Sequence, residues 1–330
     1  MNEKIQKIAH QSLQNKQVSH DDALYLMHVD GDELYDLFYW ANKIRIKYFG
    51  HTIKGCAIVS AQQGRCTEDC SFCSQSARYH TGVKEFPLVD TDRILDTAKS
   101  AEQTGSGSLG IVTSGYRIRN AQDLDKICKT IESIARETCI HPHGSFGVLT
   151  EEVAESLAKS GLKRLNHNLE TSERFFPHIC TTHTFADRLH TIRAAKKAGL
   201  EICSGAIFGI GEAAEDRINL AFTLKELDVD VVPLNFLHAI PGTPLENNVP
   251  LTPMESLKII SVFRFILPDK EIKVAGGREK NLRDLQSWIF YAGANSTMIG
   301  NYLTTQGRKA EVDLQMIKDL NLVLDNHVTT

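Results

Sequence analysis

The chain has 330 residues, of which 42% are hydrophobic and 24% charged, a composition typical of a globular protein that can bury a sizeable core. Its net charge of −4 contains no long run of one sign, so nothing indicates binding to nucleic acid or to a membrane surface. No stretch approaches the roughly 18 apolar residues of a spanning helix, and the N-terminus lacks the apolar core of a signal peptide, so we expect a cytoplasmic protein.

The first 50 residues have a helical pattern, and we expect helices over residues 21–48 that cover the rest of the molecule. From residue 55 onward, short β-rich runs alternate with amphipathic helical segments such as 121–138, in which the apolar residues fall on one face. The β-rich runs begin at Gly55, Ser108, Cys139, Leu162, Glu201, Val231, Glu271 and Asn295.

Regular strand–helix repetition predicts an α/β fold, a (β/α)8 barrel of TIM type, with an N-terminal helical cap and a C-terminal extension. A doubly wound open sheet is the alternative, although it usually has fewer strands. The expected division is an N-terminal helical extension over 1–50, the barrel over 51–305 and a C-terminal helical segment over 306–330. Within the last segment, residues 311–324 are expected to form one more helix.

Eight cysteines in a large cytoplasmic chain indicate metal binding or reactivity more often than disulfides. Cys66, Cys70 and Cys73 form a CxxxCxxC motif directly after the first expected strand. Three thiolates on one loop can bind three irons of a [4Fe–4S] cluster and leave the fourth iron free to chelate S-adenosylmethionine (SAM). Phe72 is placed to shield the cluster and touch the adenine. A zinc site is the alternative, but zinc usually takes four ligands as paired CxxC motifs, and no second pair follows.

A second pattern lies at the end of a later strand, in the segment Phe208-Gly209-Ile210-Gly211-Glu212. Gly209 would let a cofactor approach the backbone, and Glu212 could accept hydrogen bonds from it. A simple tight turn explains the same residues, so this signal is weak on its own.

Several longer segments share their order and spacing with one family. They are RCTEDCSFCSQSARYHTG, LNHNLETS, CSGAIFGIGE, PLNFLHAIPGTPLE, GGRE and AGANSTMIGNYLTT. In these segments, from about residue 53 to the C-terminal region, the chain resembles the biotin synthase family of radical SAM enzymes. The resemblance implies a sulfurtransferase that converts dethiobiotin to biotin, with sulfur from an auxiliary iron–sulfur cluster. It also implies a homodimer and a flavodoxin- or ferredoxin-like electron donor.

The resemblance also assigns residues to the two ligands. It implies that Asn166 and Asn168 lie at the boundary between SAM and dethiobiotin, and that Glu170 holds the ribose hydroxyls of SAM, where the family commonly has Asp. Arg188 would contact SAM, and Asn235 would bind the ureido ring of dethiobiotin. Amide and carboxylate groups suit a ureido ring and a diol. No side chain is assigned as a catalytic acid or base, since the cofactor generates the radical.

The chain departs from the family at the auxiliary cluster, which is ordinarily a [2Fe–2S] cluster held by three cysteines and an arginine. Of these ligands only Cys203 is in place. Gly110 replaces one cysteine, His143 or a neighbour stands at another, and Lys273 replaces the arginine. An ordinary [2Fe–2S] site is therefore doubtful.

Other residues offer a different ligand set for this auxiliary cluster. Cys56 lies on the first strand, and Cys139, His141 and His143 alternate along the third, so the last three share one face. If that face points inward, Cys56, Cys203 and one or more of the others could hold a different cluster. The alternative is that these residues belong to an ordinary core, since a buried Cys often acts as a small apolar residue.

Two further cysteines are assigned no ligand role, and two alternative functions remain open. Cys128 is expected in the core on a helix face, and Cys180 is expected to be structural. A related radical SAM enzyme without sulfur insertion, of the mutase or hydrogenase-cofactor maturation type, is the second functional hypothesis, favoured by the missing ligands. A non-catalytic metal-binding protein is a third, for which no feature of the sequence argues.

Overall fold

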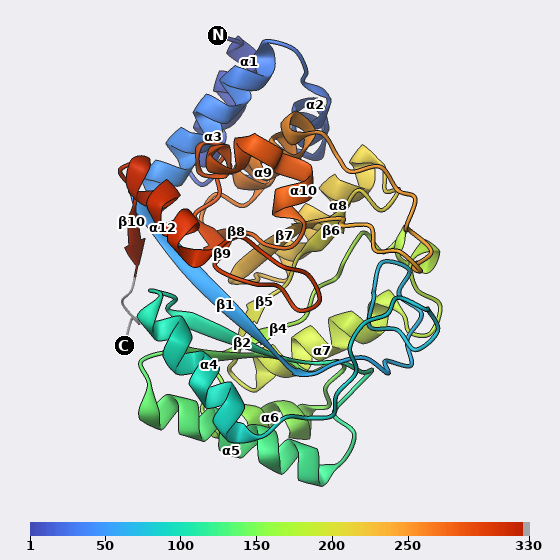
Figure 1. The fold of residues 1–330 in the computed structure, drawn as a ribbon. Coiled ribbons are helices and arrows are strands. Elements are labelled where there is room, and N and C mark those ends of the chain that lie inside the picture. Colours follow the sequence, from blue (N-terminus) through green and yellow to red (C-terminus); the bar gives the residue numbers. More distant parts are fainter. Residues whose placement is uncertain (326–330) are drawn as a thin grey trace.

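The computed structural model describes residues 1–325, and its centre is a closed barrel of parallel strands within a layer of helices (Figure 1). Eight positions follow one another in the order β1, β2, β3, β4, β5, β7, β8 and β9, and β9 closes the barrel on β1. The strands are β1 (Thr52–Gln62), β2 (Ser108–Thr113), β3 (His141–Ser145), β4 (Arg164–Asn166), β5 (Glu201–Cys203), β6 (Ala206–Phe208), β7 (Val231–Phe236), β8 (Glu271–Val274) and β9 (Ser296–Met298). The predicted barrel is confirmed, and the open sheet is excluded.

The fifth position of the barrel is split into β5 and β6, which both pair with β7. The break falls at Gly205, where an added Cβ would lie only 1.9 Å from the carbonyl oxygen of Pro233. The freed amide of Gly205 donates to the side chain of Asn168, at 3.2 Å. The break in the fifth strand therefore allows a hydrogen bond between its backbone and Asn168, a residue at the barrel mouth.

Alternation along the strands separates two environments. Outward-facing Leu165, Ile202 and Ile272 are fully buried against the helices. Their neighbours along the same strands, such as Cys203 and Lys273, face the barrel interior. Both faces of each strand are therefore buried, as is usual for parallel sheets.

Helices cover the outside of the barrel, and several of them begin at residues whose side chains cap the helix N-terminus. The side chain of Asn120 caps α5 by accepting from the amide of Asp123, and Thr184 forms a capping box with Asp187 at the start of α7. The helices are α4 (Thr91–Gln103), α5 (Ala121–Glu137), α6 (Glu151–Lys159), α7 (Phe185–Lys197), α8 (Ala214–Glu226), α9 (Pro253–Ile266), α10 (Arg278–Leu282) and α11 (Trp288–Tyr291), with short 3₁₀ turns η1 (Phe176–His178) and η2 (Arg283–Ser287).

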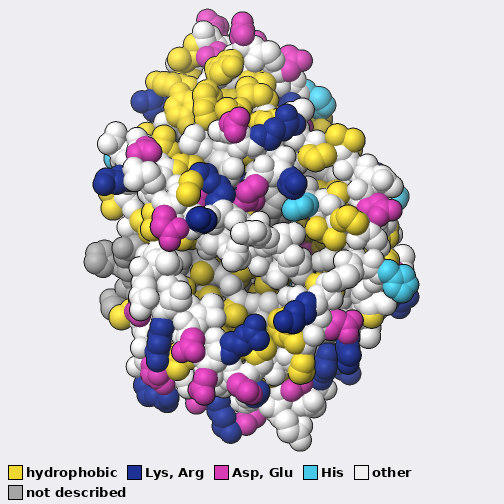
Figure 2. Space-filling view, viewed as in Figure 1, with side chains coloured by type: hydrophobic (Ala, Val, Ile, Leu, Met, Phe, Trp, Pro, Cys, Tyr) yellow, Lys and Arg dark blue, Asp and Glu magenta, His cyan; other side chains and the backbone are white. Residues whose placement is uncertain are grey.

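Three N-terminal helices, α1 (Glu3–Leu13), α2 (His20–His28) and α3 (Glu33–Phe49), pack on α8, α9 and α11. They add a layer outside the barrel helices, and α9 is almost wholly buried beneath it. Figure 2 shows hydrophobic side chains gathered over this end of the molecule. Tyr35 of α3 and Tyr291 of α11 are exposed there. No helix within residues 1–325 has the length and hydropathy needed to span a bilayer.

The C-terminal segment differs in part from the prediction. The expected helix over 311–324 is α12 (Ala310–Asp319), and it is followed by a strand, β10 (Val323–Asp325). The strand pairs in parallel with the start of β1, where Thr52 lies opposite Val323. The prediction of helix to the end was wrong because hydrogen-bonding groups of β1 are available to pair there. Residues 326–330 of the predicted segment lie outside the described residues.

A buried ion pair fixes α12 to the barrel. Arg278 donates to both carboxylate oxygens of Asp313, at 2.9 and 2.7 Å, and to the hydroxyl of Thr297 in β9. The side chains of Arg278 and Asp313 are 1% and 0% exposed. Breaking a buried pair leaves an uncompensated charge in the interior.

We therefore expect Asp313→Asn to lower the free energy of unfolding by about 3 kcal/mol. Thermal unfolding of the anaerobically purified protein would measure the effect as a lower Tm. Glu311→Gln, on the exposed first turn of the same helix, is the control. Equal Tm values for the two variants would contradict the assignment.

Candidate functional site

The CxxxCxxC loop leaves the C-terminal end of β1, at the mouth of the barrel. Backbone hydrogen bonds close it on itself, because Cys66 N–H donates to Gln75 O at 3.0 Å and Cys73 N–H to Cys70 O at 2.9 Å. The three thiols line one cavity of about 300 Å³. The structure therefore brings Cys66, Cys70 and Cys73 together as the sequence predicts.

The segment that follows η1 braces this loop. Asp69 accepts hydrogen bonds from the backbone N–H groups of Thr181 and Thr182, at 2.9 and 3.2 Å. The N–H of Ser71 donates to the carbonyl of Ile179 at 2.8 Å. Burial raises the pKa of Cys73 to about 11. Such thiols become thiolates when a metal replaces the proton, so the loop is chemically suited to a metal cluster.

The opposite wall of the cavity is polar and incompletely paired. Asn166 Oδ1, His167 Nε2, Glu170 Oε2 and Arg188 Nε are buried and have no hydrogen-bond partner among residues 1–325. Buried polar groups in native proteins are nearly always paired, so these four atoms indicate a polar ligand in the cavity. Burial raises the pKa of Glu170, while the nearby Arg188 guanidinium, at 3.8 Å, favours its charged form.

Arg188 is held in place from several sides. It lies on the first turns of α7 and donates to the backbone carbonyl of Asn168 at 2.7 Å and to His183 Nε2 at 3.0 Å. Its guanidinium also lies over the ring of Phe176, 5.4 Å from the centroid. Its buried Nε–H, which has no partner in the described part of the chain, is therefore held in a fixed direction and is available to a ligand.

A second cavity, of about 270 Å³, adjoins the first and shares Phe72, Cys73, Asn168 and Glu170 with it. Asn235 lines this second cavity, where its side chain accepts from Gly276 N–H at 2.9 Å and donates to Ala206 O at 3.0 Å. Both bonds hold the amide in one orientation and leave its second hydrogen and further lone pair available.

The loop after β9 lies over the two cavities. Leu303 lines both of them, and the hydroxyls of Thr304 and Ser74 are 3.1 Å apart. Tyr302 donates to the carbonyl of Ala275 at 3.1 Å. Side chains from this loop therefore link the C-terminal part of the chain to the cysteine loop.

The structure does not bring Gly209 and Glu212 to these cavities. The Glu212 carboxylate accepts from the N–H groups of Gly209 and Ile210 and from Arg217 Nε at 2.8 Å. Gly209 has a φ of +88°, which favours glycine. These contacts indicate that the segment shapes its own turn, which was the alternative explanation of the motif.

Deeper in the barrel lies a second group of chemically active side chains. Cys56 of β1 and Cys203 of β5 are both buried, and burial raises the pKa of Cys203 to about 11. Lys273 of β8 is buried with them. Burial acts against its charge, but Cys56, Cys203 and Glu271 together raise its pKa. Glu271 Oε1 lies 4.0 Å from the Lys273 ammonium.

Of the candidate ligands on or near the third strand, His143 is buried and Cys139 is not. His143 is 1% exposed, its Nδ1 has no partner, and burial lowers its pKa, so the ring is neutral and able to bind a metal. Cys139 precedes β3 and is exposed at the rim of a cavity of about 590 Å³ at the opposite end of the barrel, which His141 and His143 also line. The structure thus separates Cys139 from the interior cysteines.

Gly110 of β2 stands where the family resemblance would lead one to expect cysteine, and a side chain there would be tightly packed. An added Cβ would lie 3.1 Å from Ile58 Cγ2 and 3.2 Å from Asn166 Nδ2. A cysteine at this position would require small shifts of these two side chains, one of which, Asn166, belongs to the polar wall of the first cavity. Ile58 and Asn166 therefore pack closely against Gly110.

Comparison with known proteins decides the family. Two family models match: the radical SAM superfamily over residues 62–224, and the biotin and thiamin synthesis associated domain over residues 233–323. The biotin synthase of Geotalea daltonii is 50% identical over 318 residues, covering 96% of this chain and 97% of that protein. The biotin synthase of Geobacter sulfurreducens is 47% identical over 97% of both. This chain belongs to the biotin synthase family.

Two solved structures share the fold of this biotin synthase family member. The crystal structure of methylornithine synthase superposes with a TM-score of 0.84 at 20% identity, covering 96% of this chain and 97% of that one. The FeFe-hydrogenase maturase HydG from Carboxydothermus hydrogenoformans gives 0.82 at 19% identity, covering 99% and 80%. At such identities the likeness shows the barrel and does not favour the maturation activity.

Membership of the radical SAM superfamily implies a [4Fe–4S] cluster and SAM. The described residues fit both groups, because three thiols face a wall with four unpaired polar atoms across one cavity. The sequence had given no functional reason to single out Cys180 or His183. The structure places both beside Cys70, and the only sequence signal was their position in a Cys-x-x-His segment.

Proposed function

We propose that this chain inserts sulfur into dethiobiotin and closes the ring of biotin, with radical chemistry begun in the first cavity and substrate held in the second. The observation that carries the proposal is the shared wall of the two cavities. It includes Cys73 of the cysteine loop together with Asn168 and Glu170. A substrate in the second cavity would therefore lie next to the reactive end of SAM in the first.

Cys66, Cys70 and Cys73 would hold the [4Fe–4S] cluster. When bound, the cluster supplies an electron to SAM, and SAM supplies the radical that activates the substrate. Glu170 would accept hydrogen bonds from the ribose hydroxyls of SAM, and Arg188 would donate its free Nε–H.

Phe72, Asn166, Asn168 and Asn235 would position the two ligands. Phe72 lines both cavities and would separate the cluster from solvent, in contact with the adenine. Asn166 and Asn168 would lie between SAM and substrate, and Asn235 would pair with the ureido ring. This positioning brings the reacting atoms together and excludes water.

The sulfur donor in this proposal is an auxiliary cluster in the barrel interior. Cys56, Cys203 and His143 are its candidate ligands, and Lys273 would offset its negative charge. Among the described residues, these three do not converge within the 4.8 Å that one metal ion would require. Exposed Cys139 is the weakest of the candidate ligands.

Anaerobic incubation of the iron-reconstituted protein with SAM, a reductant and dethiobiotin tests the function. We expect both 5′-deoxyadenosine and biotin. Formation of 5′-deoxyadenosine without biotin would refute sulfur insertion and favour the second functional hypothesis. Absence of SAM cleavage would refute both.

Glu170→Gln is expected to weaken SAM binding about tenfold or more, because a hydrogen bond to a charged group contributes about 1.5–3 kcal/mol. Calorimetric titration of the cluster-loaded protein with SAM would measure the change. Glu173→Gln, three residues further on and exposed, is the control. Equal affinities for the two variants would refute the role of Glu170.

Four other expectations remain predictions. They are the homodimer, the flavodoxin- or ferredoxin-like electron donor, the cytoplasmic location and the division at residues 50 and 305. Gel filtration of the reconstituted protein would test the first of these.

A further inference from the structure

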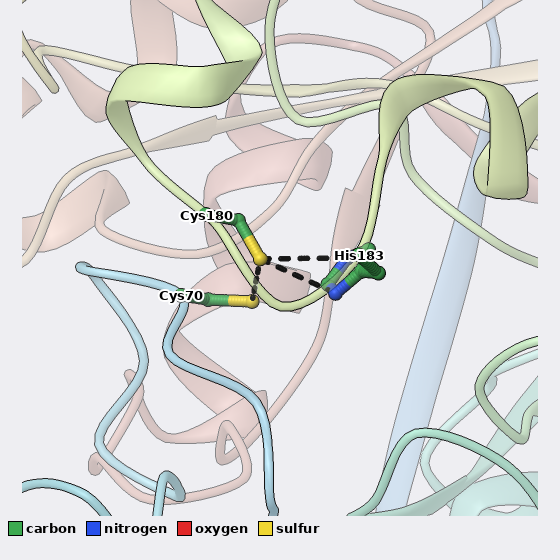
Figure 3. Close-up of side chains that lie close together, drawn as sticks. All are labelled: Cys70, Cys180 and His183. Carbon is green, nitrogen blue, oxygen red and sulfur yellow. Dashed lines mark hydrogen bonds between the residues drawn. The ribbon is translucent and has the colours of Figure 1, made fainter.

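Three side chains from two separate segments meet behind the cysteine loop: Cys70, Cys180 and His183 (Figure 3). Cys180 Sγ lies 3.8 Å from Cys70 Sγ and 3.2 Å from His183 Nδ1. Cys180 is 3% exposed, and it follows η1 in the segment that braces the loop. The buried thiol of Cys180 is therefore in contact with Cys70, one of the three cysteines of the motif.

Hydrogen bonding at His183 argues against a separate metal site formed by these three residues. Its Nε2 faces Arg188 Nη2 at 3.0 Å, and arginine can only donate, so Nε2 accepts. Its Nδ1 faces the Glu68 carboxylate at 2.7 Å, so Nδ1 carries the hydrogen. Both ring nitrogens are thus engaged, and the ring orients its Nδ1–H towards Glu68 and the sulfur of Cys180.

The direction of the contact between the two sulfurs follows from the chemistry of the loop. A cysteine that binds iron is a thiolate and has no proton to donate, so only Cys180 can donate between them. The Thr182 hydroxyl lies 3.6 Å from the Cys180 sulfur, and a nearer acceptor is Asp69 Oδ1, at 3.3 Å. That oxygen already accepts from Thr181 N–H, Thr182 N–H and the Thr182 hydroxyl. Because Asp69 Oδ1 is already engaged by three donors and the Thr182 hydroxyl is uncharged, a Cys70 thiolate 3.8 Å away is the charged acceptor available to the thiol.

We propose that Cys180 is a positioning residue that donates an S–H hydrogen bond to the Cys70 sulfur and thereby raises the reduction potential of the SAM-binding cluster. Hydrogen bonds to ligand sulfurs are among the features that set such potentials. Reduction adds negative charge to the cluster, so a donor at a ligand sulfur stabilises the reduced state more than the oxidised state. The inference rests on Cys70 being a cluster ligand, as proposed above.

Redox titration of the reconstituted protein, followed by the electron paramagnetic resonance signal of the reduced cluster, tests the proposal. In Cys180→Ala we expect about three- to fivefold less reduced cluster relative to oxidised at a fixed potential. For a one-electron couple this is a shift of about 30–40 mV to lower potential. Cys180→Ser keeps a donor and should recover at least part of the shift. Cys128→Ala, a partly buried cysteine on α5, should match the parent.

Any of the following outcomes for the Cys180 variants would overturn the proposal. An unchanged potential in Cys180→Ala would show that no hydrogen bond reaches the cluster. A higher potential would show that Cys180 carries negative charge there, and equal shifts in the Ala and Ser variants would indicate packing alone. Loss of iron from both variants would make Cys180 a requirement for cluster binding. Failure of the parent protein to bind a cluster or cleave SAM would instead refute the proposed function.

Discussion

Replacement of Cys73 by alanine is expected to abolish reductive SAM cleavage, with a loss of more than about 100-fold. Mutation of groups that merely support metal ligands costs about 10–100-fold, so removal of a ligand should cost more. Cys73 is the suitable position, because Cys70 has Cys180 within 3.8 Å as a possible substitute thiol. The measurement is 5′-deoxyadenosine formed per protein under anaerobic reducing conditions.

Cys128→Ala is the matched control for Cys73→Ala, since the Cys128 sulfur lies on α5 near the backbone oxygen of Ser156 and lines neither cavity at the mouth. It should cleave SAM like the parent. If the Cys73 variant, with its iron content measured, still cleaved SAM at the parental rate, the assignment of the loop as the cluster site would fail.

The second large effect is expected from Cys56→Ala combined with Cys203→Ala. These thiols lie deep in the barrel and do not line either cavity at the mouth. We therefore expect SAM cleavage to persist while biotin formation falls more than about 100-fold, because the sulfur donor has lost its ligands. Iron and sulfide content, with Mössbauer spectra, should show that only the SAM-binding cluster remains.

Cys139→Ala serves as the comparison for this double variant. Cys139 is exposed at the far rim, so the structure favours parental iron content and biotin formation in this variant. Biotin formation at the parental level in the double variant would exclude Cys56 and Cys203 as ligands. A loss in Cys139→Ala as large as in the double variant would make Cys139 a ligand, against its position in the structure.

Sequence reasoning placed the strands of the barrel well because both strand faces are buried there. Short β-rich runs between capped helices result, and these patterns are local. The same reasoning failed at residues 320–324, where helical periodicity continues but the chain forms β10. Pairing with Thr52–Lys54 of β1 decides that strand, and no local pattern reports it.

The candidate site likewise has residues that the sequence could assign and residues whose place only the structure revealed. Cys66, Cys70 and Cys73 could be assigned from the sequence, because their spacing within one loop is itself the geometry that a cluster needs. The family resemblance added residues that the barrel then brought together, such as Glu170 and Arg188. The glycine-containing pattern at residues 208–212 suggested Glu212, whose carboxylate the structure shows bound to its own turn.

By itself, the sequence determined the barrel and the three-thiol loop, since both are set by contiguous residues whose spacing fixes their geometry. Only the tertiary structure decided which distant groups face the same space. It joined Cys180 to Cys70 across 110 residues, separated exposed Cys139 from Cys56 and Cys203, and left four polar atoms unpaired around one cavity. The physical reason is that burial and pairing depend on how the whole chain packs, which the spacing of residues along the chain does not specify.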